Sequence, residues 1–79
     1  SSSTQIMYTL STAASVNITI YNSMQQLIKV LVNENKPAGS YTADWNILNS
    51  NGAKVSVGIY RVTVTLGNMQ YSSILQVIR

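Results

Sequence analysis

The 79-residue chain lacks both cysteine and histidine. Without cysteine it forms no disulfide, and without either residue it has no ligand set for a structural zinc ion. Such cross-links often stabilise small domains, which bury only about 60–65% of the surface of the unfolded chain. This chain must therefore depend on its apolar residues, which make up 46% of the sequence, or on partners that bury more of them.

Charge is also scarce. Charged residues make up 9% of the chain, compared with about 25% in an ordinary domain. Five basic and two acidic residues give a net charge of +3. The polar surface must consist mainly of Ser, Thr, Asn and Gln, which provide little repulsion between copies. This composition fits a protein displayed outside the cell, and one that packs against copies of itself.

Two classes of partner are not indicated. The basic residues are scattered singly, whereas a nucleic-acid surface would show a basic patch with aromatic platforms. No apolar run approaches the ~18 residues of a membrane helix, so we expect no membrane insertion.

No signal peptide is visible and the chain starts at Ser1, which predicts a processed chain or an excised module that has lost its leader.

Apolar and polar residues alternate with a period of two through most of the chain, which indicates half-buried β-strands. The clearest alternation places Val16, Ile18 and Ile20 on one face of a strand. No segment shows the 3.6-residue period of a helix. We predict a polar leader, flexible or donated to another chain, over residues 1–4, and strands over residues 5–10, 16–21, 26–32, 40–45, 59–66 and 69–78.

Residues that tolerate a left-handed backbone separate these strands. The segment Asn49-Ser50-Asn51-Gly52 predicts a tight reversal, Gly67-Asn68 predicts a two-residue hairpin turn, and residues 33–39 are expected to form a loop. About seven strands with turns every 8–12 residues predict an antiparallel β-sandwich of immunoglobulin or fibronectin-III type. We expect one such domain over residues 5–79, with a small closed barrel as the alternative.

Several short motifs recur in the order of a known family: Ile6-Met7-Tyr8-Thr9-Leu10, Val16-Asn17-Ile18-Thr19-Ile20-Tyr21, Leu31-Val32-Asn33-Glu34, Pro37-Ala38-Gly39, Trp45, Asn51-Gly52 and Gly58-Ile59-Tyr60. Over nearly its whole length the chain resembles the immunoglobulin-like domain of flagellar hook-capping proteins. It is even closer to the C-terminal sorting domains of proteins exported by the type IX secretion system. The resemblance implies an extracytoplasmic, non-catalytic β-sandwich, and in the sorting version a terminal module recognised during export or anchoring.

The landmarks of this pattern are expected to specify the fold rather than chemistry. We assign structural roles to a loop residue, a core anchor, glycines at turns and strand starts, and a strand tyrosine: Pro37, Gly39, Trp45, Gly52, Gly58 and Tyr60. The chain departs from the family at Asn22 and Gln25, where an Asp and a Gly are common, so that turn must close differently. It also has Asn46 where the family often has Asp after Trp.

Groups that carry chemistry are few. Without His or Cys, a general base would have to be Glu34, Asp44, a Lys or a Tyr. The two acids are predicted on or beside loops with no pocket between them, so we expect no enzyme and no cofactor. A calcium loop normally brings several carboxylates, and Asp44 is joined only by asparagines. We therefore expect turn residues there rather than a metal site.

Two segments, residues 27–32 and 74–78, are apolar on both alternating faces. A sandwich strand needs only one apolar face. Either each is a central strand with its outer side covered by a loop, or the outer face or edge meets another chain. The candidate interaction residues are Met7, Lys29, Ile74, Gln76 and Ile78, with Lys29 expected to be the one charge that blocks its strand edge.

We therefore predict a non-catalytic extracellular structural module that mediates protein–protein association, as a terminal sorting, anchoring or scaffold domain. An alternative is the subunit of a self-assembling cell-surface filament that uses strand addition. A third is a carbohydrate-binding module with Trp45 and tyrosines as stacking platforms, although Trp45 is more simply the core anchor. The expected partners are other protein chains, including copies of itself.

Overall fold

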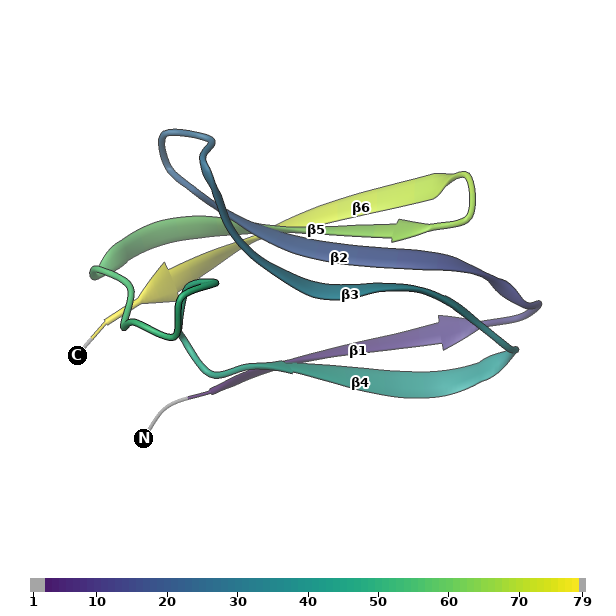
Figure 1. Ribbon diagram of the computed structural model, residues 1–79. Coiled ribbons are helices and arrows are strands. Elements are labelled where there is room, and N and C mark those ends of the chain that lie inside the picture. The colour runs from purple at the N-terminus through teal and green to yellow at the C-terminus, as the bar shows by residue number, and fades with distance from the viewer. Residues whose placement is uncertain (1–2, 79) are drawn as a thin grey trace.

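The computed structural model describes residues 3–78, within which the chain forms six β-strands and no helix (Figure 1). Residues 1 and 2 of the predicted leader lie outside the described residues, and the first strand begins at Thr4, opposite Trp45. The strands are β1 (Thr4–Leu10), β2 (Ala14–Asn22), β3 (Leu27–Lys36), β4 (Gly39–Trp45), β5 (Gly58–Leu66) and β6 (Met69–Val77).

The strands form two antiparallel sheets. One is the two-stranded sheet β1-β4, and the other is a four-stranded sheet in the order β3-β2-β5-β6 (Figure 1). The predicted all-β, antiparallel fold class is confirmed, with six strands rather than about seven. The segment between β4 and β5 contributes only an isolated bridge between Leu48 and Lys54.

The core lies between the two sheets. Val16, Ile18 and Ile20 of β2 are fully buried, as their alternation predicts, and Trp45 is fully buried at the end of β4. Burying one such aliphatic side chain stabilises the fold by about 1.5–3 kcal/mol. The remaining core residues come from both sheets and from the β4–β5 connection: Tyr8, Leu10, Ala43, Val55, Tyr60, Val62 and Val77.

Strand β3 is longer than the sequence indicates, and the predicted loop over residues 33–39 is wrong for its first four positions. Residues 33–36 continue the ladder opposite residues 14–17 of β2. Polar residues are tolerated there because this stretch of the strand is mostly exposed, and Lys36 Nζ lies 3.9 Å from Glu34 Oε1. The connection to β4 shrinks to Pro37 and Ala38.

Both segments with two apolar faces turn out to be edge strands. In the four-stranded sheet β3 forms one edge and β6 the other. The prediction of a central strand with its outer side covered is therefore wrong for both. Alternation along one strand does not reveal the order of strands in a sheet, which is set by long-range pairing.

Candidate functional site

The two acidic residues lie on strands of different sheets. Glu34 lies on β3 and Asp44 on β4, in different sheets. Both are exposed, and Glu34 pairs with Lys36. Within residues 3–78 no three His, Cys, Asp or Glu side chains gather closely enough to hold a metal ion. The same residues include no helix long and apolar enough to cross a membrane.

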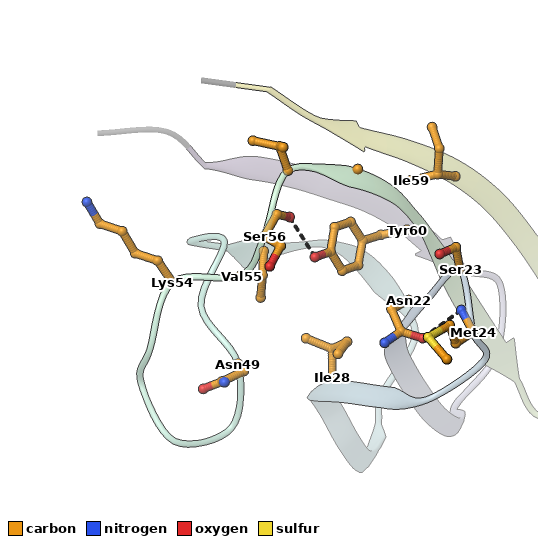
Figure 2. A pocket seen from close by; sticks show the side chains of 12 residues that line it. Asn22, Ser23, Met24, Ile28, Asn49, Lys54, Val55, Ser56, Ile59 and Tyr60 are labelled. Atoms are coloured by element: carbon orange, nitrogen blue, oxygen red, sulfur yellow. Dashed lines mark hydrogen bonds between the residues drawn. The ribbon is translucent and has the colours of Figure 1, made fainter.

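A cleft of about 330 Å³ opens at one end of the sandwich, between the β2–β3 turn and the β4–β5 connection (Figure 2). Ile28, Val55 and Tyr60 give it apolar walls, and the exposed side chain of Met24 lies at its side. Lys54 belongs to its rim but points away from the other side chains (Figure 2). The residues that line the cleft include no acidic side chain.

One wall of the cleft is the β2–β3 turn, where the chain departs from the family pattern. The side-chain oxygen of Asn22 accepts hydrogen bonds from the backbone N–H groups of Met24 and Gln26, both at 2.9 Å. This is the role an Asp carboxylate plays in such turns. Gln25 adopts a φ of 63°, the left-handed conformation that a glycine would supply without strain.

The other wall is the β4–β5 connection, which is tied down by asparagine and serine. Asn49 Oδ1 accepts from the N–H groups of Asn51 and Ala53 at 2.9 and 3.0 Å. The backbone N–H and hydroxyl of Ser50 both donate to the carbonyl of Ile28 on β3, at 3.1 and 3.0 Å. The connection is therefore an ordered cap, and the side-chain oxygen of Asn49 closes a turn.

Two aromatic residues close the core beneath this cap. Trp45 donates its indole N–H to the carbonyl of Leu48 at 2.9 Å, and its ring packs edge-on against Tyr60 at 5.6 Å. The Tyr60 hydroxyl donates to the carbonyl of Ser56 at 2.7 Å (Figure 2). Because Trp45 is fully buried, it presents no face on which a sugar ring would stack.

A tyrosine pair marks the opposite end of the sandwich, near the β3–β4 connection. Tyr8 stacks on Tyr41 with ring centroids 5.5 Å apart, and Lys36 Nζ lies 4.7 Å from the centre of the Tyr41 ring. The Tyr41 hydroxyl donates to the carbonyl of Pro37 at 2.6 Å. Burial raises the pKa of the Tyr8 hydroxyl. The positive charge of Lys36 lowers this pKa, whereas the negative charges of Tyr41 and Glu34 raise it further.

The other residues assigned structural roles lie at turns and strand starts. Gly39 begins β4 and Gly58 begins β5. Gly52 lies in the β4–β5 connection, where its N–H donates to the carbonyl of Asn49 at 3.0 Å. With Pro37, they mark the points at which the chain changes direction.

The candidate interaction residues do not gather on one surface. Met7 is 79% exposed on β1, in the two-stranded sheet, whereas Lys29 is half-buried on β3. Ile74, Gln76 and Ile78 lie on or just after β6, at the opposite edge from β3. Because β3 extends to Lys36, Lys29 is not the one charge on that strand, which also carries Glu34 and Lys36.

Strand β6 and the residue after it bring together three of these residues and two that the sequence pattern did not indicate. Ile74 is 62% and Ile78 74% exposed. On the other face, Met69 and Tyr71 are 54% and 50% exposed, although they pair with Leu66 and Val64, which pack against the core. The inner face of an edge strand such as β6 is covered only if the facing sheet is wide enough to reach it. The facing sheet here has two strands, which the sequence pattern did not show.

Comparison with known proteins identifies a family. The family model described as FlgD Ig-like domain matches residues 1–70, which span β1 to β5 and the first two residues of β6. No match was found among curated proteins or among solved structures. The matched region contains the turns, the cleft and every core residue except Val77, whereas most of β6 lies beyond it.

Proposed function

Because the chain belongs to the FlgD Ig-like domain family, we propose that it is a non-catalytic structural module that attaches an exported protein to other protein chains outside the cytoplasm. In this role it serves as a terminal sorting, anchoring or scaffold domain. Family membership supports a protein-interaction module, and the surface of the described residues supports binding without catalysis. The cleft lacks acidic residues, and the two acids of the chain lie in different sheets.

The exposed edge strand β6 is the observation that favours association most strongly. It carries exposed apolar residues on both faces and no charged residue. An uncharged and unpaired strand edge is a ready site for another chain to add a strand. Few proteins leave such an edge unprotected, so its presence on a small domain supports a partner.

The sorting role is tested by moving the domain. A monomeric fluorescent reporter carrying the domain at its C-terminus would be expressed in the native host, beside the host protein from which the domain has been deleted. We expect the reporter to reach the cell surface or the medium, and the deleted protein to be retained. Unchanged localisation in both experiments would remove the sorting role.

A matched control separates recognition of the folded domain from an effect of added sequence. Trp45→Ala removes the largest fully buried side chain, and such core truncations cost about 3–5 kcal/mol. The same reporter carrying this variant is expected to lose its new location. If it were sorted equally well, a linear peptide signal rather than the sandwich would be recognised.

A second candidate is the subunit of a cell-surface filament. It is favoured because β1, an edge of the other sheet, also carries no charged residue. A head-to-tail contact between a β6 edge and a β1 edge generates a fibre when its rotation does not close a ring. Electron microscopy at high concentration and several salt levels is expected to show filaments if this holds, and dispersed particles if it does not.

A further inference from the structure

The free edge of β6 differs from the other edge of the same sheet. Strand β3 carries Lys29, Glu34 and Lys36, and its pairing with β2 has two register shifts. Charges and bulges of this kind discourage edge-to-edge pairing. Strand β6 spans nine residues without a charge, a proline, a glycine or a register shift. It is the longest unprotected edge among the described residues.

The register shows which backbone groups of β6 face outward. Gly67 N donates to the carbonyl of Ser15 at 2.8 Å, so odd-numbered positions of β5 bond β2 and even-numbered ones bond β6. Leu66 pairs with Met69 across the two-residue turn. The odd-numbered residues of β6 therefore bond β5. The N–H and C=O groups that face the free edge belong to Gln70, Ser72, Ile74 and Gln76.

We propose that the β6 edges of two copies of this chain pair antiparallel about a two-fold axis that passes beside Ser73, so that one eight-stranded sheet runs through a symmetric dimer. Ser73 is the midpoint of Met69–Val77. This register alone pairs all nine residues of the strand with residues of the second copy. It also places outward-facing N–H and C=O groups opposite one another, as an antiparallel ladder requires.

The side chains of the strand are complementary to themselves in this register. Met69 lies opposite Val77 of the second copy, Tyr71 opposite Leu75, and Gln70 opposite Gln76. Ser73 lies opposite Ser73 on the face of the apolar pairs, and Ser72 lies opposite Ile74 on the face of the glutamines. Cross-strand apolar pairs stabilise neighbouring strands, and no like charges oppose each other in this register. The exposed half of each β6, with Met69 and Tyr71, comes to lie beside the half of the other that contains buried Val77 and half-buried Leu75.

This dimer goes beyond the proposed function and does not depend on the sorting role. The residues that would form its centre lie in the part of β6 beyond the family match, which ends at residue 70. A two-fold contact uses the same surface on both copies and closes, so it predicts a dimer rather than a fibre. Loss of dimerisation with intact sorting, or the reverse, would separate the two proposals.

Single cysteines test the register directly, because the chain has none of its own. In the dimer, the two Ser73 residues form a pair without ladder hydrogen bonds, with Cα atoms about 4.5 Å apart, which is within the range of a disulfide. Ser73→Cys is expected to become a covalent dimer of twice the 8.6 kDa chain on mild oxidation with diamide. Ser72→Cys on the same strand and Ser56→Cys in the β4–β5 connection are expected to stay mostly monomeric.

Three results would overturn the proposal. The first is equal cross-linking of all three cysteine variants, which would indicate random collision. The second is preferential cross-linking at Ser72→Cys, which would indicate another register. The third is a wild-type chain that sediments as a monomer at millimolar concentration, or as a ladder of multimers, which would favour the filament instead.

A charge pair tests the same axis without a covalent bond. Ser73→Lys and Ser73→Glu each place like charges opposite each other, and each is expected to raise the dimer dissociation constant by roughly fivefold or more. Mixing the two variants is expected to restore a one-to-one dimer. Because Ser73 is exposed, both variants should keep the wild-type circular dichroism spectrum, and dimers that form equally well in all samples would contradict the axis.

Discussion

At the scale of single residues, the side chains of two asparagines stabilise turns of this domain. Asn22 and Asn49 each accept two backbone hydrogen bonds through the side-chain oxygen, at opposite walls of the cleft. At a chain reversal these N–H groups have no partner on a neighbouring strand, and the asparagine side chain takes the place of that partner. The side-chain amide also lets Asn22 donate to Gln26 Oε1 at 2.9 Å, which an aspartate would not do.

Gln25 is the residue at which the β2–β3 turn stores strain. A non-glycine residue at a φ of 63° destabilises the folded state by about 1 kcal/mol or more. Glycine removes this strain, but it also raises the entropy of the unfolded chain, which offsets part of the gain. Gln25→Gly is therefore expected to raise the free energy of unfolding by about 0.5 kcal/mol. Chemical denaturation followed by Trp45 fluorescence measures this change.

Gln26→Gly is the matched control, since Gln26 lies next to Gln25 but outside the left-handed region. That variant is expected to be destabilised or unchanged. If both glycine variants were destabilised to the same extent, the left-handed conformation of Gln25 would not be a source of strain.

Tyr8 makes stability depend on alkaline pH. Burial raises the pKa of its hydroxyl in the folded state above the value of about 10 of a free tyrosine. Below the unfolded pKa both states hold the proton, so this contribution is fully present. As the pH rises further, the unfolded state ionises first, and the contribution is lost as the pH passes through the folded pKa.

The measurement compares the free energy of unfolding of the wild type and Tyr8→Phe between pH 8 and 11. The variant lacks the ionisable hydroxyl, so its curve is expected to fall less steeply at the alkaline end. Parallel curves over the whole range would contradict a raised pKa for Tyr8.

At the scale of elements, the β5–β6 hairpin is closed by Gly67 and Asn68. Gly67 has a φ of 63° and Asn68 does not have a positive φ, which is the pattern of a type II′ turn. Gly67→Ala is expected to lower the free energy of unfolding by about 1 kcal/mol, because alanine disfavours this conformation. An added Cβ would make only an ordinary contact of 3.8 Å with Ala14. The loss of stability would therefore come from backbone strain rather than from a steric clash.

Asn68→Ala is the control for the hairpin, since it changes the adjacent residue in the same turn. Its effect is expected to be less than half as large in the same denaturation experiment. If the two alanine variants were equally unstable, the turn would not depend on the glycine.

Local pattern was sufficient to predict elements that depend on local chemistry. The alternation in β2, the Gly67-Asn68 hairpin and the reversal at Asn49–Gly52 were all visible in the sequence. The extension of β3 to Lys36 was not visible, because its polar residues pair with a strand some twenty residues earlier. A left-handed Gln25 was also hidden, since nothing local marks a residue that the surrounding turn holds in a strained state.

The candidate interaction surface was predicted only in part. Two-faced apolarity pointed to Ile74, Gln76 and Ile78, which lie on or beside the free edge of β6. It also pointed to Lys29, which lies on β3, and the fifth candidate, Met7, lies on β1. Met69 and Tyr71 were missed because their face of the strand is the core face, and only the narrowness of the two-stranded sheet leaves them exposed.

At the scale of the whole molecule, the domain is a small sandwich of unequal layers. Its radius of gyration is 12.7 Å, close to the roughly 12 Å expected for a compact chain of this length. A four-stranded sheet faces a two-stranded one (Figure 1), so part of the larger sheet has no layer above it. A partner that covered the exposed part of this sheet would stabilise the domain, because whatever binds only the folded state stabilises it.

Association at the β6 edge would change the amide hydrogen exchange of β6, and this exchange can be measured residue by residue. In the dimer, the N–H groups of Gln70, Ser72, Ile74 and Gln76 are hydrogen-bonded, so their exchange is expected to slow as protein concentration rises. Odd-numbered amides of β6 bond β5 in every state and serve as the internal reference. Fast, concentration-independent exchange at the four even-numbered amides would contradict association at the β6 edge.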